Sequence, residues 1–179
     1  MCPDSTTQIV TIPESLVRCV HEAVIGTCTS VFGSAPSLEP GSEVPHEGAT
    51  LIGIISFTGT LTWTCMMGLP QGTACPVVEK FAGFPLEFDA PEMGDAVGEF
   101  LNVIAGDLVA RLEAANIKAQ MSLPTTARGQ NVEMMLPAGI ASQVLRYGSS
   151  LGRFWVKLAT GKSDHTRAAG TPCPSCGRC

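Results

Sequence analysis

The sequence predicts one α+β domain, a mainly antiparallel β-sheet with helices packed on one face, including one long central helix. Two segments of the 179-residue chain have the apolar periodicity of helices, and several shorter ones have the composition of strands. The strand segments are separated by short turns, which is typical of antiparallel pairs. These observations favour a single sheet that carries its helices on one side.

The composition fits one globular domain with loose ends. Hydrophobic residues make up 45% of the chain and charged residues 15%, which is enough apolar material for a core. Only the middle of the chain has periodic hydrophobicity. We therefore expect a flexible arm at residues 1–10, a domain at 11–160 and a disordered cysteine-containing tail at 161–179.

Charge and hydropathy argue against two classes of partner. The formal net charge is −5 and the Lys and Arg residues are not clustered, so we expect no nucleic-acid binding. No apolar run reaches the roughly 18–20 residues that a membrane span needs, so we expect no membrane partner. Residues 1–10 lack the basic start and apolar core of a signal peptide, and we expect a cytoplasmic protein with mostly reduced cysteines.

The first predicted helix runs from about Pro13 to Val31. Its apolar residues recur at helical spacing, and Thr11 and Glu14 have the spacing of a capping box. A connector rich in Gly, Pro and Ser is predicted at 33–48.

A β-hairpin is predicted next, with strands at 50–57 and 60–70 joined at residues 58–60. The second strand alternates apolar and threonine side chains, which indicates a sheet with one buried face. A short helix at 74–83 precedes a turn-rich segment at 84–92.

The long helix is predicted at 91–115, with Asp89 as its N-cap and Asn116 as a left-handed stop. Its apolar side chains fall in one stripe that faces the core. Four short strands are expected after it, at 117–123, 131–136, 142–147 and 153–159. The polar residues between the first two of these strands, Thr125, Thr126, Arg128 and Asn131, are expected to form a turn.

The opposite stripe of the long helix is polar. Four residues fall in one narrow arc and a fifth borders it: Asp95, Glu99, Asn102, Gly106 and, at the border, Gly98. Acids and amides usually point into water, so a solvated face is the ordinary interpretation. The alternative is a docking face, where glycines let another protein come close and Glu99 and Asn102 project into it.

The segment DAVGEFLNVIAG in this helix resembles the signature of the CheX/CheC/FliY family of chemotaxis phosphatases. In that family an Asp or Ser is followed four residues later by Glu and three residues after that by Asn, as in Asp95, Glu99 and Asn102. The flanking segments GIISFTGTLTWTCMMGLP and MSLPTTARGQNVEMMLP are similar to the family's strands. The resemblance covers about 49–158, and the single motif is similar to CheX rather than to the two-copy CheC pattern.

The resemblance implies a hydrolase, a protein phosphatase of a phosphorylated CheY-type response regulator in chemotaxis or two-component signalling. Its substrate would be an aspartyl phosphate, and the regulator would supply Mg²⁺ and a lysine, so we expect no metal or cofactor of the chain's own. By position, Asn102 would orient the attacking water and Glu99 would pair with that lysine. We expect Asp95, Gly98 and Gly106 to support contact with the regulator.

Two other functions stay open. A non-catalytic adaptor or dimerisation module of the same fold would bind a signalling protein through this face without hydrolysis. A metal or redox role is suggested by the Cys-x-x-Cys spacings of Cys173, Cys176 and Cys179. Either His165 or a second chain would complete such a site, although a loose tail of oxidisable thiols is the expectation. The family resemblance also implies a homodimer that joins sheets.

Overall fold

The computed structural model describes residues 11–45 and 48–160. Within them the helices and strands follow in the order α1 (Glu14–Phe32), β1 (Ser37–Glu39), β2 (Ala49–Gly59), β3 (Trp63–Pro70), α2 (Gln71–Ala82), α3 (Pro91–Ala114), β4 (Ala119–Met121), β5 (Thr125–Gln130), β6 (Ala141–Ser149) and β7 (Gly152–Thr160). Among these helices, none has the length and apolar character of a membrane span.

The strands form one antiparallel sheet in the order β1-β6-β7-β3-β2-β4, and β5 also pairs with β2. β4 lies beside Phe57–Gly59 at the end of β2, whereas β5 lies beside Ala49–Ile54. The two short strands therefore follow each other along the same side of β2. This arrangement confirms the predicted α+β class and the antiparallel sheet.

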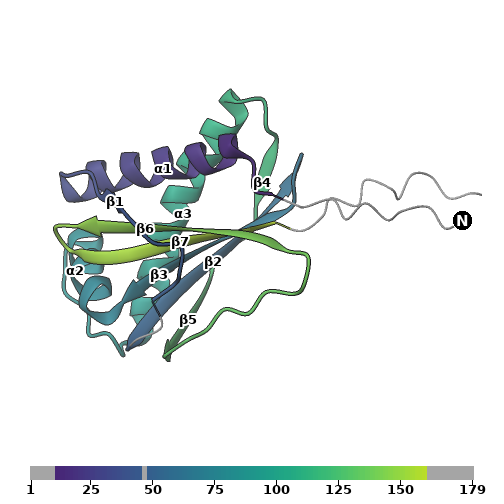
Figure 1. The fold of residues 1–179 in the computed structure, drawn as a ribbon. Helices are drawn as coiled ribbons and strands as arrows, with labels where there is room; N and C mark the ends of the chain where they lie inside the picture. Colours follow the sequence, from purple (N-terminus) through teal and green to yellow (C-terminus); the bar gives the residue numbers. More distant parts are fainter. Residues whose placement is uncertain (1–10, 46–47, 161–179) are drawn as a thin grey trace, which may run out of the picture.

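The three helices cover one face of the sheet, with α1 lying across α3 (Figure 1). The main core lies between them and the strands, as predicted. The long helix contributes one continuous apolar stripe to this core: Met93, Val97, Phe100, Leu101, Ile104, Leu108 and Leu112. Burial of this stripe holds α3 against the sheet, because removing apolar side chains from water is the dominant favourable term in folding.

The other face of the sheet is also covered in part, which corrects the expectation of a single buried face. A second apolar cluster there joins Ile52 of β2, Met66 of β3 and Trp155 of β7. Val44 and side chains from the segment 131–140 pack on this cluster. The middle of the sheet is therefore buried on both sides.

Two predictions between α3 and β6 were wrong. Residues 125–130 form strand β5 rather than a turn, and residues 131–136 form no strand. β5 has a polar sequence because it lies at the edge of the sheet, where most of its side chains are exposed. The apolar run at 131–136 covers the second face of the sheet instead, so its hydrophobicity reports burial and not strand pairing.

The helix ends agree with the prediction only in part. In the described residues α1 is capped at Pro13 and α3 at Ala90, and neither cap makes a side-chain hydrogen bond. The predicted caps at Thr11 and Asp89 were therefore wrong. Asn116 has a φ of 59° directly after the C-cap residue Ala115 of α3, which confirms the left-handed stop.

Candidate functional site

The three residues of the family motif, Asp95, Glu99 and Asn102, lie together on the side of α3 away from its buried apolar stripe. This side is called the open face of α3. Their spacing of four and three residues puts Asp95, Glu99 and Asn102 one above another, with about 5–6 Å between successive Cβ atoms. Asp95 and Glu99 are exposed and Asn102 is half-buried. The structure thus brings the three residues into one line, on the side away from the buried stripe.

The polar groups of these side chains are not used inside the described part of the chain. Within residues 11–45 and 48–160, Asp95, Glu99 and Asn102 make no side-chain hydrogen bond or ion pair. Farther along the same helix, Arg111 binds the Asp107 carboxylate at 3.0 Å and the Glu22 carboxylate of α1 at 3.2 Å. The carboxylates at Asp95 and Glu99 and the carboxamide at Asn102 are therefore available to another molecule.

The glycines of α3 divide into two sets. A Cβ at Gly94 would lie 3.0 Å from Thr126 Oγ1, and a Cβ at Gly98 would lie 3.6 Å from Thr126 Cγ2 and 3.7 Å from Pro124 Cγ. Gly98 is buried against β5, where an added methyl group would make ordinary van der Waals contacts, so only the Gly94 position is tight. This corrects the expectation that Gly98 borders the open face.

Gly106 belongs to the second set of glycines in α3. It is exposed, and apart from its chain neighbours and the nearby helix backbone a Cβ there would meet no described atom within 4 Å. Gly106 continues the line of Asp95, Glu99 and Asn102 toward the carboxyl end of the helix. The open face therefore includes one position with no side chain at all.

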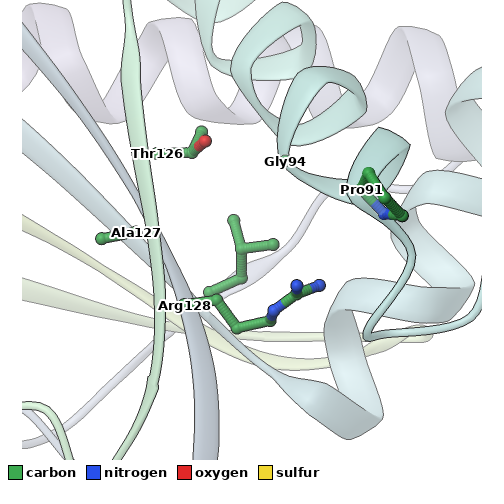
Figure 2. Close-up of a pocket in the computed structure, with 6 residues that line it drawn as sticks. Pro91, Gly94, Thr126, Ala127 and Arg128 are labelled. Atoms are coloured by element: carbon green, nitrogen blue, oxygen red, sulfur yellow. The ribbon is translucent and has the colours of Figure 1, made fainter.

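Strand β5 fixes the start of α3. In Figure 2, Thr126 and Arg128 point from the strand toward the helix, and Ala127 points away. The Arg128 guanidinium donates hydrogen bonds to the carbonyl oxygens of Phe88 and Ala90, the latter at 3.2 Å. These contacts border a hollow of about 230 Å³ at the amino end of the helix.

The sequence interpretation missed Arg128 as a residue that positions the site. It expected this arginine in a turn, and a single arginine in a polar segment gives no signal of its partner. The hydrogen bonds of Arg128 depend on the pairing of β5 with β2, which puts this side chain opposite the start of α3. Arg128 ties the strand to Phe88 and Ala90, which lie three residues and one residue before the start of α3.

The motif side chains carry groups that can form hydrogen bonds with another molecule. Glu99 offers a carboxylate that accepts hydrogen bonds, and Asn102 offers both a donor and an acceptor. The described residues hold no group of three or more His, Cys, Asp or Glu side chains that would bind a metal ion. The candidate ligands Cys173, Cys176, Cys179 and His165 lie outside the described residues.

Solved structures with a similar fold include several chemotaxis proteins. A CheC-like superfamily protein from Shewanella sp. PV-4 has a TM-score of 0.70 at 14% identity, over 83% of this chain and 98% of that chain. CheX from Desulfovibrio desulfuricans has a TM-score of 0.68 at 18% identity, over 80% and 97% of the two chains. The CheX–CheY–BeF3–Mg²⁺ complex from Borrelia burgdorferi gives 0.68 at 16% identity, over 82% and 98%. At such identities the likeness shows the fold.

The family itself follows from the sequence. The comparison with curated proteins found no match. The family model described as chemotaxis phosphatase CheX matches residues 51–147, which is more than half of the chain and includes the whole of α3. The chain therefore belongs to the CheX family.

Proposed function

We propose that this protein dephosphorylates a CheY-type response regulator in chemotaxis or two-component signalling. The observation that carries the proposal is the pair Glu99 and Asn102, which stand one helical turn apart on the open side of α3 without a partner in the described residues. Two findings support it. The family is described as chemotaxis phosphatases, and one protein of similar fold forms a complex with CheY, BeF3 and Mg²⁺.

The proposed reaction is the hydrolysis of an aspartyl phosphate. A water oxygen attacks phosphorus, the bond from phosphorus to the aspartyl oxygen breaks, and the electron pair leaves with the carboxylate. The proton lost by the water passes to phosphate or solvent. Because this mixed anhydride is already activated, catalysis requires mainly an in-line water and neutralisation of the phosphoryl charge. In this proposal Mg²⁺ and a lysine of the regulator supply the neutralisation.

Asn102 holds the attacking water in this scheme. Its amide oxygen accepts a hydrogen bond from the water and its amide nitrogen donates to a phosphoryl oxygen, so one side chain relates the two reactants. A glutamine has the corresponding role toward water in GTPases. The half-buried position of Asn102 on a rigid helix limits the rotamers available to it, which favours one geometry for the water.

Glu99 sets the register of the complex by pairing with the regulator's lysine. Asp95 and Glu99 are like charges four residues apart, which costs an isolated helix a few tenths of a kcal/mol. A partner cation placed beside them relieves that repulsion and adds a charge-assisted hydrogen bond. Asp95 and the bare backbone at Gly106 extend the contact along the helix.

The proposed enzyme is a cytoplasmic homodimer. β1 forms one edge of the sheet and β4 and β5 together form the other, and a free edge can pair with a second copy. Light scattering after gel filtration tests this part of the proposal, and a monomer at every concentration would contradict it.

The test is the decay of a phosphorylated CheY-type regulator from the same organism. Wild type is expected to speed decay, Asn102→Ala to bind the regulator without speeding decay, and Glu99→Ala to bind it more weakly. If wild type binds a regulator but leaves its decay unchanged, the protein is an adaptor. If wild type neither binds any of the organism's regulators nor speeds the decay of their phosphorylated forms, both the phosphatase and the adaptor functions are excluded.

A further inference from the structure

Two exposed apolar side chains lie on the chain segment that borders the motif. Leu123 is 87% exposed and Met121 is 40% exposed. Both belong to the segment that passes from β4 to β5 along β2. Because an apolar side chain gains free energy when it leaves water, exposed apolar residues beside a polar docking face suggest that a partner covers them.

The position of Leu123 relative to the motif follows from its neighbour. The ring of Pro124 lies over Gly98, where a Cβ would be 3.7 Å from Pro124 Cγ. Gly98 directly precedes Glu99 and is one turn before Asn102. Adjacent Cα atoms are about 3.8 Å apart. The backbone of Leu123 therefore lies one residue away from the contact between Pro124 and the middle of α3.

The backbone at Leu123 is anchored through its neighbour Ser122. The Ser122 amide donates to the Ser56 carbonyl at 2.8 Å, and the Ser122 hydroxyl accepts from the Ser56 amide at 3.1 Å. The same hydroxyl donates to the Leu123 carbonyl at 2.9 Å. Leu123 is therefore exposed on a backbone that is held in place, so little ordering entropy is lost when a partner covers it.

We propose that Leu123, together with Met121, is an apolar contact for the receiver domain of the phosphorylated regulator. This inference rests on the proposed function. A specific interface covers about 800 Å² on each partner, far more than three motif side chains present. A partner that places its phosphoryl group at Asn102 therefore also covers the neighbouring segment. An apolar anchor beside a charged pair is the arrangement in which interface energy usually concentrates.

The regulator is the occupant that the geometry favours over a second copy of this chain. Leu123 precedes Pro124, which packs on Gly98 next to Glu99. In the proposed function, the polar groups of Glu99 and Asn102 meet a partner that brings a cation and a phosphoryl group. A second copy would bring its own acidic stripe to the same place, since the chain carries a net charge of −5. The second copy is kept as an outcome of the test.

The experiment measures binding of a beryllofluoride-activated regulator and the steady-state dephosphorylation of the phosphorylated one. Leu123→Asp is expected to raise both the Kd and the half-saturating regulator concentration by at least about tenfold, which corresponds to about 1.4 kcal/mol. The maximal rate at saturation should stay close to that of wild type, because Asn102 still positions the water. Leu123→Ala is expected to act in the same direction with a smaller effect.

Met135→Asp is the matched control. Met135 is also an apolar residue, 83% exposed, but it belongs to the segment 131–140 that packs on the opposite face of the sheet. Its substitution should leave binding and rate unchanged. Thermal unfolding of all variants, followed by circular dichroism, shows whether each one is folded, and Leu123→Ala replaces Leu123→Asp if the charged variant unfolds.

Three outcomes overturn the inference, and they differ in whether they also contradict the proposed function. If wild type is active and Leu123→Asp has an unchanged half-saturating concentration, only this inference fails. If sedimentation shows that Leu123→Asp changes self-association and not regulator binding, the occupant is a second copy. If wild type neither binds nor dephosphorylates a regulator, the proposed function fails with it.

Discussion

The two faces of α3 differ in how completely the chain uses them. Leu101 is 1% exposed and lies against Gly53 of β2, where a Cβ would be 2.9 Å from its Cδ2. Asn102, the next residue, makes no side-chain hydrogen bond in the described part of the chain. The Leu101 side chain is therefore packed inside the fold, whereas the polar group of its neighbour Asn102 has no hydrogen-bond partner among the described residues.

This difference separates residues that maintain the fold from residues whose polar groups have no partner in the described part of the chain. Charge alone does not make the distinction, since Asp107 on the same helix is paired with Arg111 at 3.0 Å. Exposure alone does not distinguish the two groups of residues either, because Gly106 is exposed but has no side-chain functional group. The useful criterion is a polar group on a helix or strand that has no partner among the described residues.

The largest expected effect is on the buried face. Leu101→Ala should lower the free energy of unfolding by about 2–5 kcal/mol, because it removes a buried side chain and leaves a cavity beside β2. Urea denaturation measures this loss. Under conditions where the variant is folded, its maximal dephosphorylation rate should remain near that of wild type. A loss below about 1 kcal/mol would show that the two faces are less distinct than the structure indicates.

The next effect is on the open face. Asn102→Ala should lower the maximal dephosphorylation rate by about 10²–10³-fold, the range for losing one group aimed at the reacting centre. Its free energy of unfolding should change by less than about 0.5 kcal/mol, as for surface substitutions without partners. Single-turnover decay at saturating enzyme separates the rate from the affinity. A large loss of stability would place Asn102 with the fold-maintaining residues.

Two glycine substitutions test whether the open face must stay bare. Gly98→Ala and Gly106→Ala should each stabilise the helix by about 1 kcal/mol, since alanine is the better helix former and both sites admit a methyl group. Only Gly106→Ala should weaken regulator binding, because the Gly98 methyl group points toward Thr126 inside the fold. Equal regulator binding by both variants would show that Gly106 does not contact the regulator.

The smallest effect distinguishes paired from unpaired charge. Arg111→Met breaks the contacts with Asp107 and Glu22 and should cost up to about 1 kcal/mol, less at high salt, because these groups are partly exposed. Glu99→Gln should instead raise stability by a few tenths of a kcal/mol by relieving repulsion from Asp95. Thermal denaturation at low and high salt measures both. A destabilising Glu99→Gln would reveal an internal partner.

The helices and the motif were predictable because they depend on local periodicity. The spacing of Asp95, Glu99 and Asn102 places them on one side of any helix that includes them, and the apolar residues between them identify the core side. Asn116 was predictable as a stop because asparagine tolerates a positive φ. Each of these features depends on residues within a few positions of each other.

The strands after α3 were only partly predictable. The composition predicted β6, β7 and the turn between them. It also predicted a strand at 131–136 and a turn at 125–130, but the strand is at 125–130. Apolar content did not distinguish an edge strand from a covering segment, since what an apolar residue packs on is set by distant parts of the chain. The buried position of Gly98 had the same origin, because Pro124 and Thr126 cover it only after β5 pairs with β2.

By itself the sequence determined the α+β class, the long helix, its two faces and the line of Asp95, Glu99 and Asn102. Helical periodicity is a local property, so 3.6 residues per turn converts spacing directly into position. The tertiary structure decided which glycines are open, that Arg128 holds the start of α3, and that Leu123 is exposed beside the motif. These features depend on strand register and packing between residues far apart in the chain, which spacing along the sequence does not encode.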